Sequence, residues 1–226
     1  MIQAVVFDFD GVIANSEPLH LEAFRGVLAE EGVGFTEEEY YRRYLGFDDF
    51  GVFRALNRDR SLGLSELRMA ELVARKASRL ADLEQTSSLL FPGAEGAIRR
   101  LAAEWPLAIA SGALRSEILR VLERTDLAGY FGAIVAAEDA PAGKPAPDPY
   151  LLAVSQLARA SGRPLRPAEC VAVEDSRWGL ESARAAGLRT VAVTHTYAAV
   201  ELGAADLVIE SLDALAPASL REMTQS

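Results

Sequence analysis

Two aspartates that lie two residues apart follow a short hydrophobic run near the start of the chain. They are Asp8 and Asp10, separated by Phe9 and followed by Gly11. Because side chains alternate along a strand, a strand here would place both carboxylates on one side and Phe9 on the other. Two carboxylates at the end of an apolar strand are costly to bury without a counter-ion, and Mg²⁺ prefers oxygen ligands of this kind. The pair indicates a metal site, although it also suits a simple turn before Gly11.

Further polar groups directly follow other hydrophobic runs. Ser111 and Gly112 offer a hydroxyl and backbone N–H groups at a helix entrance, which can hold phosphate oxygens. Lys144 lies in a turn rich in glycine and proline, from which its ammonium can neutralise a carboxylate or a phosphate. Glu174 and Asp175 add two carboxylates after a later run. Taken singly, the serine also suits a helix N-cap and the acidic pair a helix N-terminus.

The hydrophobic runs themselves predict the elements that position these residues. Runs that are apolar on both faces are typical of a parallel sheet covered by helices. The predicted strands are Ala4–Phe9, Leu107–Ala110, Ala133–Ala137, Val171–Val173, Thr190–Val193 and Leu207–Ile209. The predicted helices between them are Glu95–Glu104, Arg115–Arg124, Asp148–Ala160 and Arg177–Ala186. This alternation predicts an α/β, doubly wound, Rossmann-like fold, in which the carboxyl ends of the strands bind ligands.

One long segment near the N-terminus interrupts this alternation. Residues 15–88 contain no convincing strand and instead predict amphipathic helices at Leu19–Glu30, Glu37–Leu45, Phe50–Asn57 and Glu66–Leu83. An all-helical insert after the first strand is typical of a cap domain on two hinges. We therefore expect an α/β catalytic core formed by residues 1–14 and 89–226, and a helical cap domain formed by residues 15–88.

Composition narrows the set of partners. The net charge of −10 disfavours nucleic acid and anionic lipid, which basic surfaces bind. No hydrophobic stretch approaches the length of a membrane span, and the N-terminus shows no signal-peptide pattern, so a cytoplasmic protein is expected. The single cysteine, Cys170, excludes an internal disulfide, and its apolar neighbours predict a buried side chain. We expect a monomer or a weak homodimer.

The combined motifs resemble those of the haloacid dehalogenase superfamily, in particular its phosphatases with a small helical cap. The run from Asp8 to Val12 resembles the first motif, Ser111 the second, Lys144 the third, and Glu174-Asp175 the fourth. The likeness extends over about residues 1–215 and is greatest to the phosphoglycolate phosphatase and β-phosphoglucomutase group. It implies Mg²⁺ as the cofactor and a small phosphorylated metabolite as the partner.

The resemblance also implies a role for each acidic residue. Asp8 would be the nucleophile that forms an aspartyl phosphate. Asp10 would protonate the leaving oxygen and later deprotonate the attacking water. Mg²⁺ would be bound by Asp8, by the backbone carbonyl of Asp10 and by Asp175, with Glu174 as a direct or indirect partner.

The remaining implied roles concern binding of the substrate. Ser111, the N–H group of Gly112 and Lys144 would hold the oxygens of the transferring phosphoryl group. In the cap, His20 and Gly46 are the expected substrate-binding residues, although a structural role in a helix is equally compatible with His20.

The leading functional prediction is hydrolysis of phosphoglycolate or a sugar phosphate, with three alternatives. A β-phosphoglucomutase-like phosphomutase would need cap cations for a second phosphate, but Leu45 and Asp49 stand where those relatives carry Lys and Arg. A dehalogenase is disfavoured because the metal-free dehalogenases lack the aspartate found here as Asp10. A non-enzymatic phospho-aspartate receiver is disfavoured because its phosphorylated aspartate follows a later strand.

Overall fold

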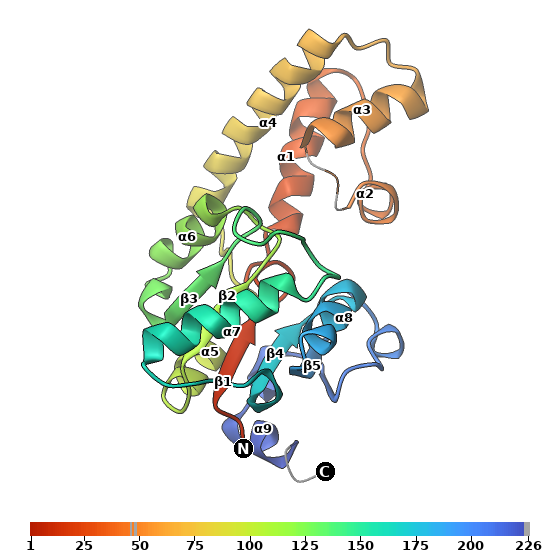
Figure 1. Ribbon diagram of the computed structural model, residues 1–226. Coiled ribbons are helices and arrows are strands. Elements are labelled where there is room, and N and C mark those ends of the chain that lie inside the picture. Colours follow the sequence, from red (N-terminus) through yellow and green to blue (C-terminus); the bar gives the residue numbers. More distant parts are fainter. Residues whose placement is uncertain (46, 48, 224–226) are drawn as a thin grey trace. The chain divides into compact units, whose positions relative to one another are not determined.

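In the computed structural model, which describes residues 1–45, 47 and 49–223, a parallel sheet forms the centre of one structural unit (Figure 1). Within these residues the sheet has six strands in the order β3-β2-β1-β4-β5-β6. The strands are β1 (Ala4–Phe7), β2 (Leu107–Ala110), β3 (Phe131–Val135), β4 (Cys170–Glu174), β5 (Arg189–Val193) and β6 (Leu207–Ile209). The strand order changes direction between β1 and β4, so ligands are expected at the carboxyl ends of these two strands.

The helices of this unit connect and cover the strands. They are α5 (Ala94–Ala102), α6 (Arg115–Arg124), α7 (Asp148–Ser161), α8 (Arg177–Ala185) and α9 (Pro217–Glu222). Helix α7 contacts β1, β2 and β3, α8 contacts β4 and β5, and the two helices touch each other, so they cover one face of the sheet. The predicted doubly wound α/β fold is confirmed, whereas the short helix α9 was not predicted.

The register between β1 and β4 places two carboxylates side by side. Ala4 pairs with Cys170, and two residues later Val6 pairs with Ala172. All four residues are fully buried in the hydrophobic cluster beneath α7 and α8. Because successive side chains alternate between faces, Asp8 and Glu174 are the next positions on that same face. The burial of Cys170 confirms its prediction as a small buried side chain.

The chain divides into two units. The first comprises Met1–Asn15 with Leu89–Ser226, and the second comprises Ser16–Ser88. Asn15, which the sequence division placed in the helical segment, belongs to the first unit, where its N–H donates to the carbonyl of Leu89 at 2.9 Å.

Helices joined by short loops make up the described residues of the second unit. Its helices are α1 (Glu17–Glu30), α2 (Glu37–Arg43), α3 (Asp49–Arg60) and α4 (Glu66–Thr86). The N-caps Thr36 and Ser65 accept hydrogen bonds from backbone N–H groups in the first turns of α2 and α4. The helices bury a shared core that is rich in aromatic side chains, including Phe24, Tyr40 and Phe53.

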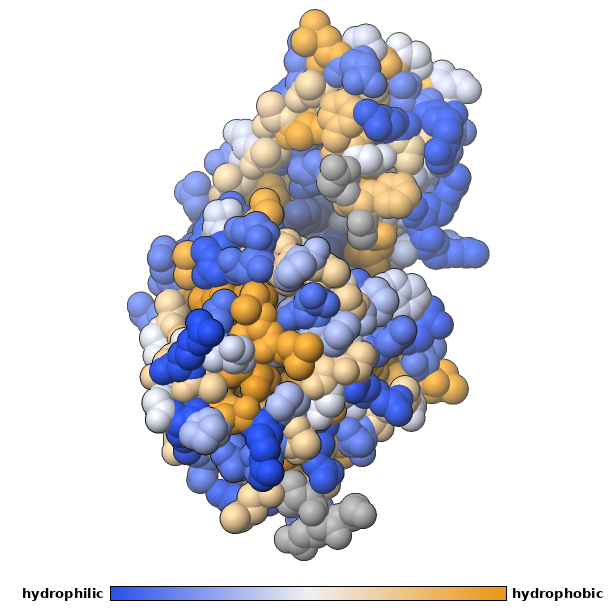
Figure 2. All heavy atoms as spheres, viewed as in Figure 1, coloured by the Kyte–Doolittle hydropathy of each residue, from blue (hydrophilic) through white to orange (hydrophobic). Residues whose placement is uncertain are grey.

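Hydrophilic residues cover much of the face seen in Figure 2, with hydrophobic residues exposed between them. Among the described residues, no helix combines the length and the hydrophobicity needed to cross a lipid bilayer.

Candidate active site

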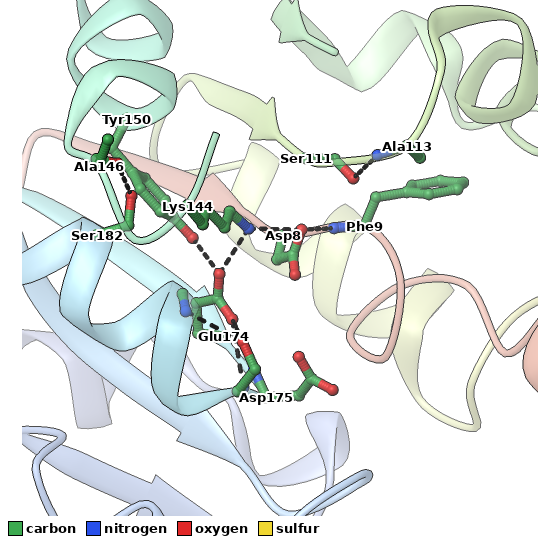
Figure 3. Close-up of polar contacts among 12 residues, drawn as sticks. Asp8, Phe9, Ser111, Ala113, Lys144, Ala146, Tyr150, Glu174, Asp175 and Ser182 are labelled. Atoms are coloured by element: carbon green, nitrogen blue, oxygen red, sulfur yellow. Dashed lines mark hydrogen bonds and ion pairs between the residues drawn. The ribbon is translucent and has the colours of Figure 1, made fainter. Parts of the chain in front are cut away.

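Asp8 is the first residue beyond β1, at the carboxyl edge of the sheet. Its N–H donates to the carbonyl of Val173 at 2.9 Å and so continues the pairing of β1 with β4. The side-chain Oδ1 atom accepts from the N–H of Phe9 at 2.7 Å and from the Lys144 ammonium at 2.8 Å (Figure 3).

Glu174, at the end of β4, has donors on both carboxylate oxygens. Its Oε1 atom accepts from the Lys144 ammonium at 2.6 Å and from the Tyr150 hydroxyl at 2.7 Å. Its Oε2 atom accepts from the N–H of Asp175 at 3.2 Å, and from the N–H and hydroxyl of Ser176 at 3.3 and 3.1 Å. A Cβ at Gly179 would lie 1.8 Å from Oε1, so glycine is required where α8 passes this carboxylate.

Three buried carboxylates converge beside Lys144. One oxygen from each of Asp8, Glu174 and Asp175 can be chosen so that all three lie within 4.8 Å of one another. When all are ionised, three negative charges face the one ammonium of Lys144. The surplus charge and the all-oxygen donor set suit a hard divalent cation such as Mg²⁺.

Burial and mutual repulsion shift the titration of these carboxylates. Burial, followed by repulsion from Glu174, raises the pKa of Asp8 well above its usual range, and Lys144 opposes this rise. Burial and Glu174 also raise the pKa of Asp175 to about 6, against a hydrogen bond from Thr196. In the absence of a cation, Asp8 and Asp175 therefore bind protons more strongly than ordinary aspartates do.

The pKa values of two hydrogen-bond partners of Glu174, Lys144 and Tyr150, are raised as well. Burial alone would lower the pKa of Lys144, but the charges of Asp8 and Glu174 raise it well above its usual value, so the ammonium stays protonated. Burial and the charge of Glu174 raise the pKa of Tyr150 far above its usual value, so its hydroxyl remains a donor. Lys144 also lies over the Tyr150 ring, 5.2 Å from its centre.

Ser111 and Gly112 lie at the end of β2, beside β1. The N–H of Ser111 pairs with the carbonyl of Val135, and its hydroxyl accepts from the N–H of Ala113 at 3.0 Å. Nothing lies within 4 Å of the position that a Cβ would take at Gly112, so its backbone is open to a ligand. Asp10 lies at the same edge, in the turn that its bridge with Ala14 closes.

Two of the predicted site residues, His20 and Gly46, belong to the helical insert. His20 belongs to α1 of the second unit, where its Nδ1 atom lies 3.0 Å from the Lys76 ammonium. Its contact with substrate stays a prediction. Gly46 lies outside the described residues.

The sequence interpretation missed four residues that support the cluster. Tyr150 and Ser176 bind Glu174, Thr196 binds Asp175, and His195 binds the carbonyl of Gly11 at 3.0 Å. Thr196 and His195 follow β5, so the rule that located the other strand-end residues also applied to them. Tyr150 gave no such signal, because it lies inside α7 and only the fold turns its hydroxyl toward β4.

Comparison with known proteins gives one consistent family. The model of the haloacid dehalogenase-like hydrolases matches residues 2–187. The chain is 34% identical to Protein CbbY of Rhodobacter capsulatus, over 98% of this chain and 99% of that protein. It is 33% identical to the Phosphorylated carbohydrates phosphatase of Thermotoga maritima, over 92% and 94%.

A solved structure agrees with the sequence relatives. The putative β-phosphoglucomutase from Thermotoga maritima superposes with a TM-score of 0.80 at 28% identity, over 98% of this chain and 99% of that one. Its match covers both the sheet and the helical insert. The chain therefore belongs to the haloacid dehalogenase-like hydrolase family.

Proposed function

We propose that this protein is a Mg²⁺-dependent phosphatase that hydrolyses a small phosphate monoester through a phosphoaspartate at Asp8. The observation that carries the proposal is the cluster of three buried carboxylates around one buried ammonium, at the carboxyl ends of β1 and β4. Phosphoryl transfer needs alignment and charge neutralisation more than further covalent chemistry. This arrangement provides a nucleophile, a cation and a metal site within a few ångströms.

The hydrogen bonds that each carboxylate already accepts distinguish direct metal ligands from residues that position them. Asp8, Asp175 and the backbone carbonyl of Asp10 would hold Mg²⁺. Glu174 already accepts five hydrogen bonds, so we assign it the role of positioning Lys144 and the start of α8. When bound, Mg²⁺ would neutralise the clustered carboxylates and the phosphoryl oxygens that approach them.

The chain's own residues would carry both halves of the reaction. A carboxylate oxygen of Asp8 attacks phosphorus, the bond from phosphorus to the ester oxygen breaks, and Asp10 donates a proton to the departing oxygen. In the second half, Asp10 removes a proton from water, the water oxygen attacks phosphorus, and inorganic phosphate leaves with Asp8 restored. The role of Asp10 rests on the family's first motif, which the chain matches.

The phosphoryl oxygens would be held by groups on two loops, one after β2 and one before α7. Lys144 would contribute its ammonium, Ser111 its hydroxyl, and Gly112 its backbone N–H. Because Glu174 and Tyr150 already orient Lys144, its charge is in place before substrate arrives. Such preorganised charge is usually the largest contribution to catalysis of this type.

For the substrate, we propose a phosphorylated carbohydrate or phosphoglycolate. The relative from Thermotoga maritima at 33% identity is named a phosphatase of phosphorylated carbohydrates. Among the more distant relatives is a Phosphoglycolate phosphatase from Pectobacterium atrosepticum, at 28% identity. Both names describe small monoesters.

A phosphomutase is the second candidate, favoured by the solved relative named a putative β-phosphoglucomutase. A mutase must hold a second phosphate with cationic side chains. The arginine and lysine side chains of the predicted cap that could bind this phosphate already form ion pairs with acidic residues. These pairs are Arg42–Glu38, Arg43–Asp59, Arg54–Glu66 and Lys76–Asp49. The arginine pairs are exposed and exchange partners at little cost. Lys76 is fully buried, so its pairing with Asp49 is the stronger argument against a mutase.

Two measurements test the proposal. With p-nitrophenyl phosphate and Mg²⁺ we expect continuous release of inorganic phosphate, and a chelator should abolish it. Full activity after verified metal removal would contradict the metal assignment, and a single phosphorylation event without turnover would favour a receiver. With β-glucose 1-phosphate and a bisphosphate primer, formation of glucose 6-phosphate with little free phosphate would instead establish a mutase.

A further inference from the structure

The loop after β5 contacts the turn that follows Asp8. Its residue His195 places Nδ1 3.0 Å from the carbonyl oxygen of Gly11. A carbonyl only accepts hydrogen bonds, so Nδ1 must carry the proton in this contact. Burial lowers the pKa of His195, so near neutral pH the ring is uncharged with its proton on Nδ1. The contact joins residues that lie 184 positions apart in the chain.

An aromatic residue also packs against the face of the His195 ring. His195 stacks on Phe91, with ring centres 4.0 Å apart and planes 14° from parallel. The N–H of Phe91 in turn donates to the carbonyl of Ile13 at 3.0 Å. The imidazole therefore connects to the Asp10–Ala14 turn at two points, directly at Gly11 and through Phe91 at Ile13.

Gly11 is the position at which this turn meets the carboxylate cluster. Its φ of +77° is a conformation that favours glycine, and a Cβ there would lie 2.0 Å from Oδ2 of Asp175. Thr196, next to His195, also binds Asp175. A small displacement of Gly11 would therefore disturb Asp175 on one side and the peptide of Asp10 on the other.

We propose that His195 is a positioning residue of the phosphatase reaction, acting through its Nδ1–H hydrogen bond to the Gly11 carbonyl. This bond holds the turn in the conformation that directs the backbone carbonyl of Asp10 toward the metal site and places its carboxylate for proton transfer. The inference rests on the proposed function. Partners that orient metal-binding groups typically affect metal affinity or activity by about 10- to 100-fold.

Two substitutions separate the hydrogen bond from the stacking. His195→Phe keeps a ring against Phe91 and removes the donor. His195→Asn places an amide N–H near the position of Nδ1 and removes the ring. With p-nitrophenyl phosphate, we expect His195→Phe to lower kcat, or to raise the Mg²⁺ concentration for half-activation, by about 10-fold or more. His195→Asn should recover most of this loss, and Val200→Ala, at a residue 89% exposed in the same loop region, serves as the control.

The outcomes distinguish this inference from the proposed function. If the wild-type protein releases no phosphate in the presence of Mg²⁺, the proposed function fails. If it does, and His195→Phe matches it in kcat and Mg²⁺ requirement, or His195→Asn is as impaired as His195→Phe, the role assigned to the hydrogen bond is wrong. A purely structural role would lower the unfolding temperature without changing the Mg²⁺ requirement.

A measurement on the wild-type protein covers the case in which His195→Phe does not fold. The chain has two histidines, His20 and His195, so their ¹⁵N resonances can be assigned with a single His20→Gln variant. At pH 8 the nitrogen shifts of His195 should show the neutral ring protonated at Nδ1. A ring protonated at Nε2 would exclude the hydrogen bond to Gly11 and overturn the inference.

Discussion

The chain has two lysines, one in each unit, and neither is an ordinary solvated side chain. Lys76 of α4 is fully buried, and 13% of the Lys144 side chain is exposed. Each ammonium lies close to a carboxylate and over an aromatic ring. Lys76 lies 2.6 Å from Asp49 and over Phe24, and Lys144 lies 2.8 Å from Asp8 and over Tyr150.

The two lysines differ in the charge balance around them. Among the described residues, Lys76 forms an ion pair with Asp49, and Nδ1 of His20 accepts a hydrogen bond from the same ammonium at 3.0 Å. Burial raises the pKa of Glu17, and the charges of Lys76 and Asp49 act on it with opposite signs, so a second carboxylate lies near this ammonium. Lys144 contacts two carboxylates, Asp8 and Glu174, and Asp175 lies beside them. Burial of a lysine alone therefore does not identify a site. At Lys144, three carboxylates lie close enough together to share one cation, and this arrangement indicates a chemical role.

The largest expected difference between the Lys144 and Lys76 regions is the effect on turnover of replacing the aspartate that pairs with each lysine. Asp8→Asn should reduce turnover of p-nitrophenyl phosphate below detection, because an amide cannot form the acyl phosphate. Its unfolding temperature should stay the same or rise, since one of the repelling buried charges is removed. The measurement combines phosphate release with thermal unfolding.

Asp49→Asn is the matched control, because it makes the same atomic change beside the other lysine. This variant should keep turnover of the small aryl ester. Wild-type rates for Asp8→Asn would show that the nucleophile lies elsewhere, and loss of turnover in Asp49→Asn would remove the functional distinction between the two regions.

The next effect separates the roles of carboxylates within the Lys144 region. Asp175→Asn removes a proposed ligand and should raise the Mg²⁺ concentration for half-activation by more than about 100-fold. Glu174→Gln leaves the proposed ligands in place but weakens the support of Lys144, so it should mainly lower kcat, by about 10- to 100-fold. Titration of activity against Mg²⁺ measures both values. Equal shifts in Mg²⁺ requirement would identify Glu174 as a direct ligand.

A smaller effect is expected for the stability of the Lys76 region. Breaking a buried ion pair costs about 3–5 kcal/mol, and partial exposure of the partner reduces this cost. Because 30% of the Asp49 side chain is exposed, Asp49→Asn should lower the free energy of unfolding by about 1–3 kcal/mol. Denaturant unfolding measures this change.

The double variant Lys76→Met with Asp49→Asn provides the control for that measurement. It removes both charges, so it should recover much of the lost stability. If the double variant is less stable than Asp49→Asn alone, the pair is not the source of the effect.

The location of the site followed from local patterns in the sequence. Six hydrophobic runs predicted the strands, and polar residues at their ends, such as Asp8 and Glu174, are brought together because parallel strands share one carboxyl edge. Lys144 reaches both carboxylates from the loop between β3 and α7. The predicted ends of strands and helices were less accurate than their locations. The first strand was predicted to reach Phe9, but it ends at Phe7, and the backbone then turns to form the bridge between Asp10 and Ala14.

Contacts between elements distant in sequence were not predictable from the same patterns. The pairing of Lys76 with Asp49 depends on how α3 and α4 pack, and nothing local to either residue indicates it. The hydroxyl of Tyr150 reaches Glu174 because α7 covers β1 and β2. His195 was interpreted as a loop residue, which is correct, but its contact with Gly11 required the positions of β1 and β5 relative to β4.

The smallest predicted effect is the pH dependence of stability that the charge surplus creates. Burial and Glu174 raise the pKa of Asp175 from an unfolded value near 3.8 to about 6, and the pKa of Asp8 is also raised. Between about pH 4 and pH 6 the folded protein therefore binds more protons than the unfolded chain. Stability must fall as pH rises through this window. The metal-free protein should thus be more stable at pH 5 than at pH 7.5, by about 1 kcal/mol or 2–4 °C.

Mg²⁺ and a variant complete this test. At pH 7.5 the carboxylates are free to bind the cation, so Mg²⁺ should raise the unfolding temperature, whereas at pH 5 protons compete for the same oxygens and the increase should be small. In Asp175→Asn both the pH slope of the metal-free protein and the response to Mg²⁺ should decrease. Asp49→Asn should keep both, because Asp49 is not part of the carboxylate cluster formed by Asp8, Glu174 and Asp175. If the metal-free wild-type protein instead gains stability from pH 5 to pH 7.5, the carboxylates are already neutralised by the protein, and the contrast between the two lysines is lost.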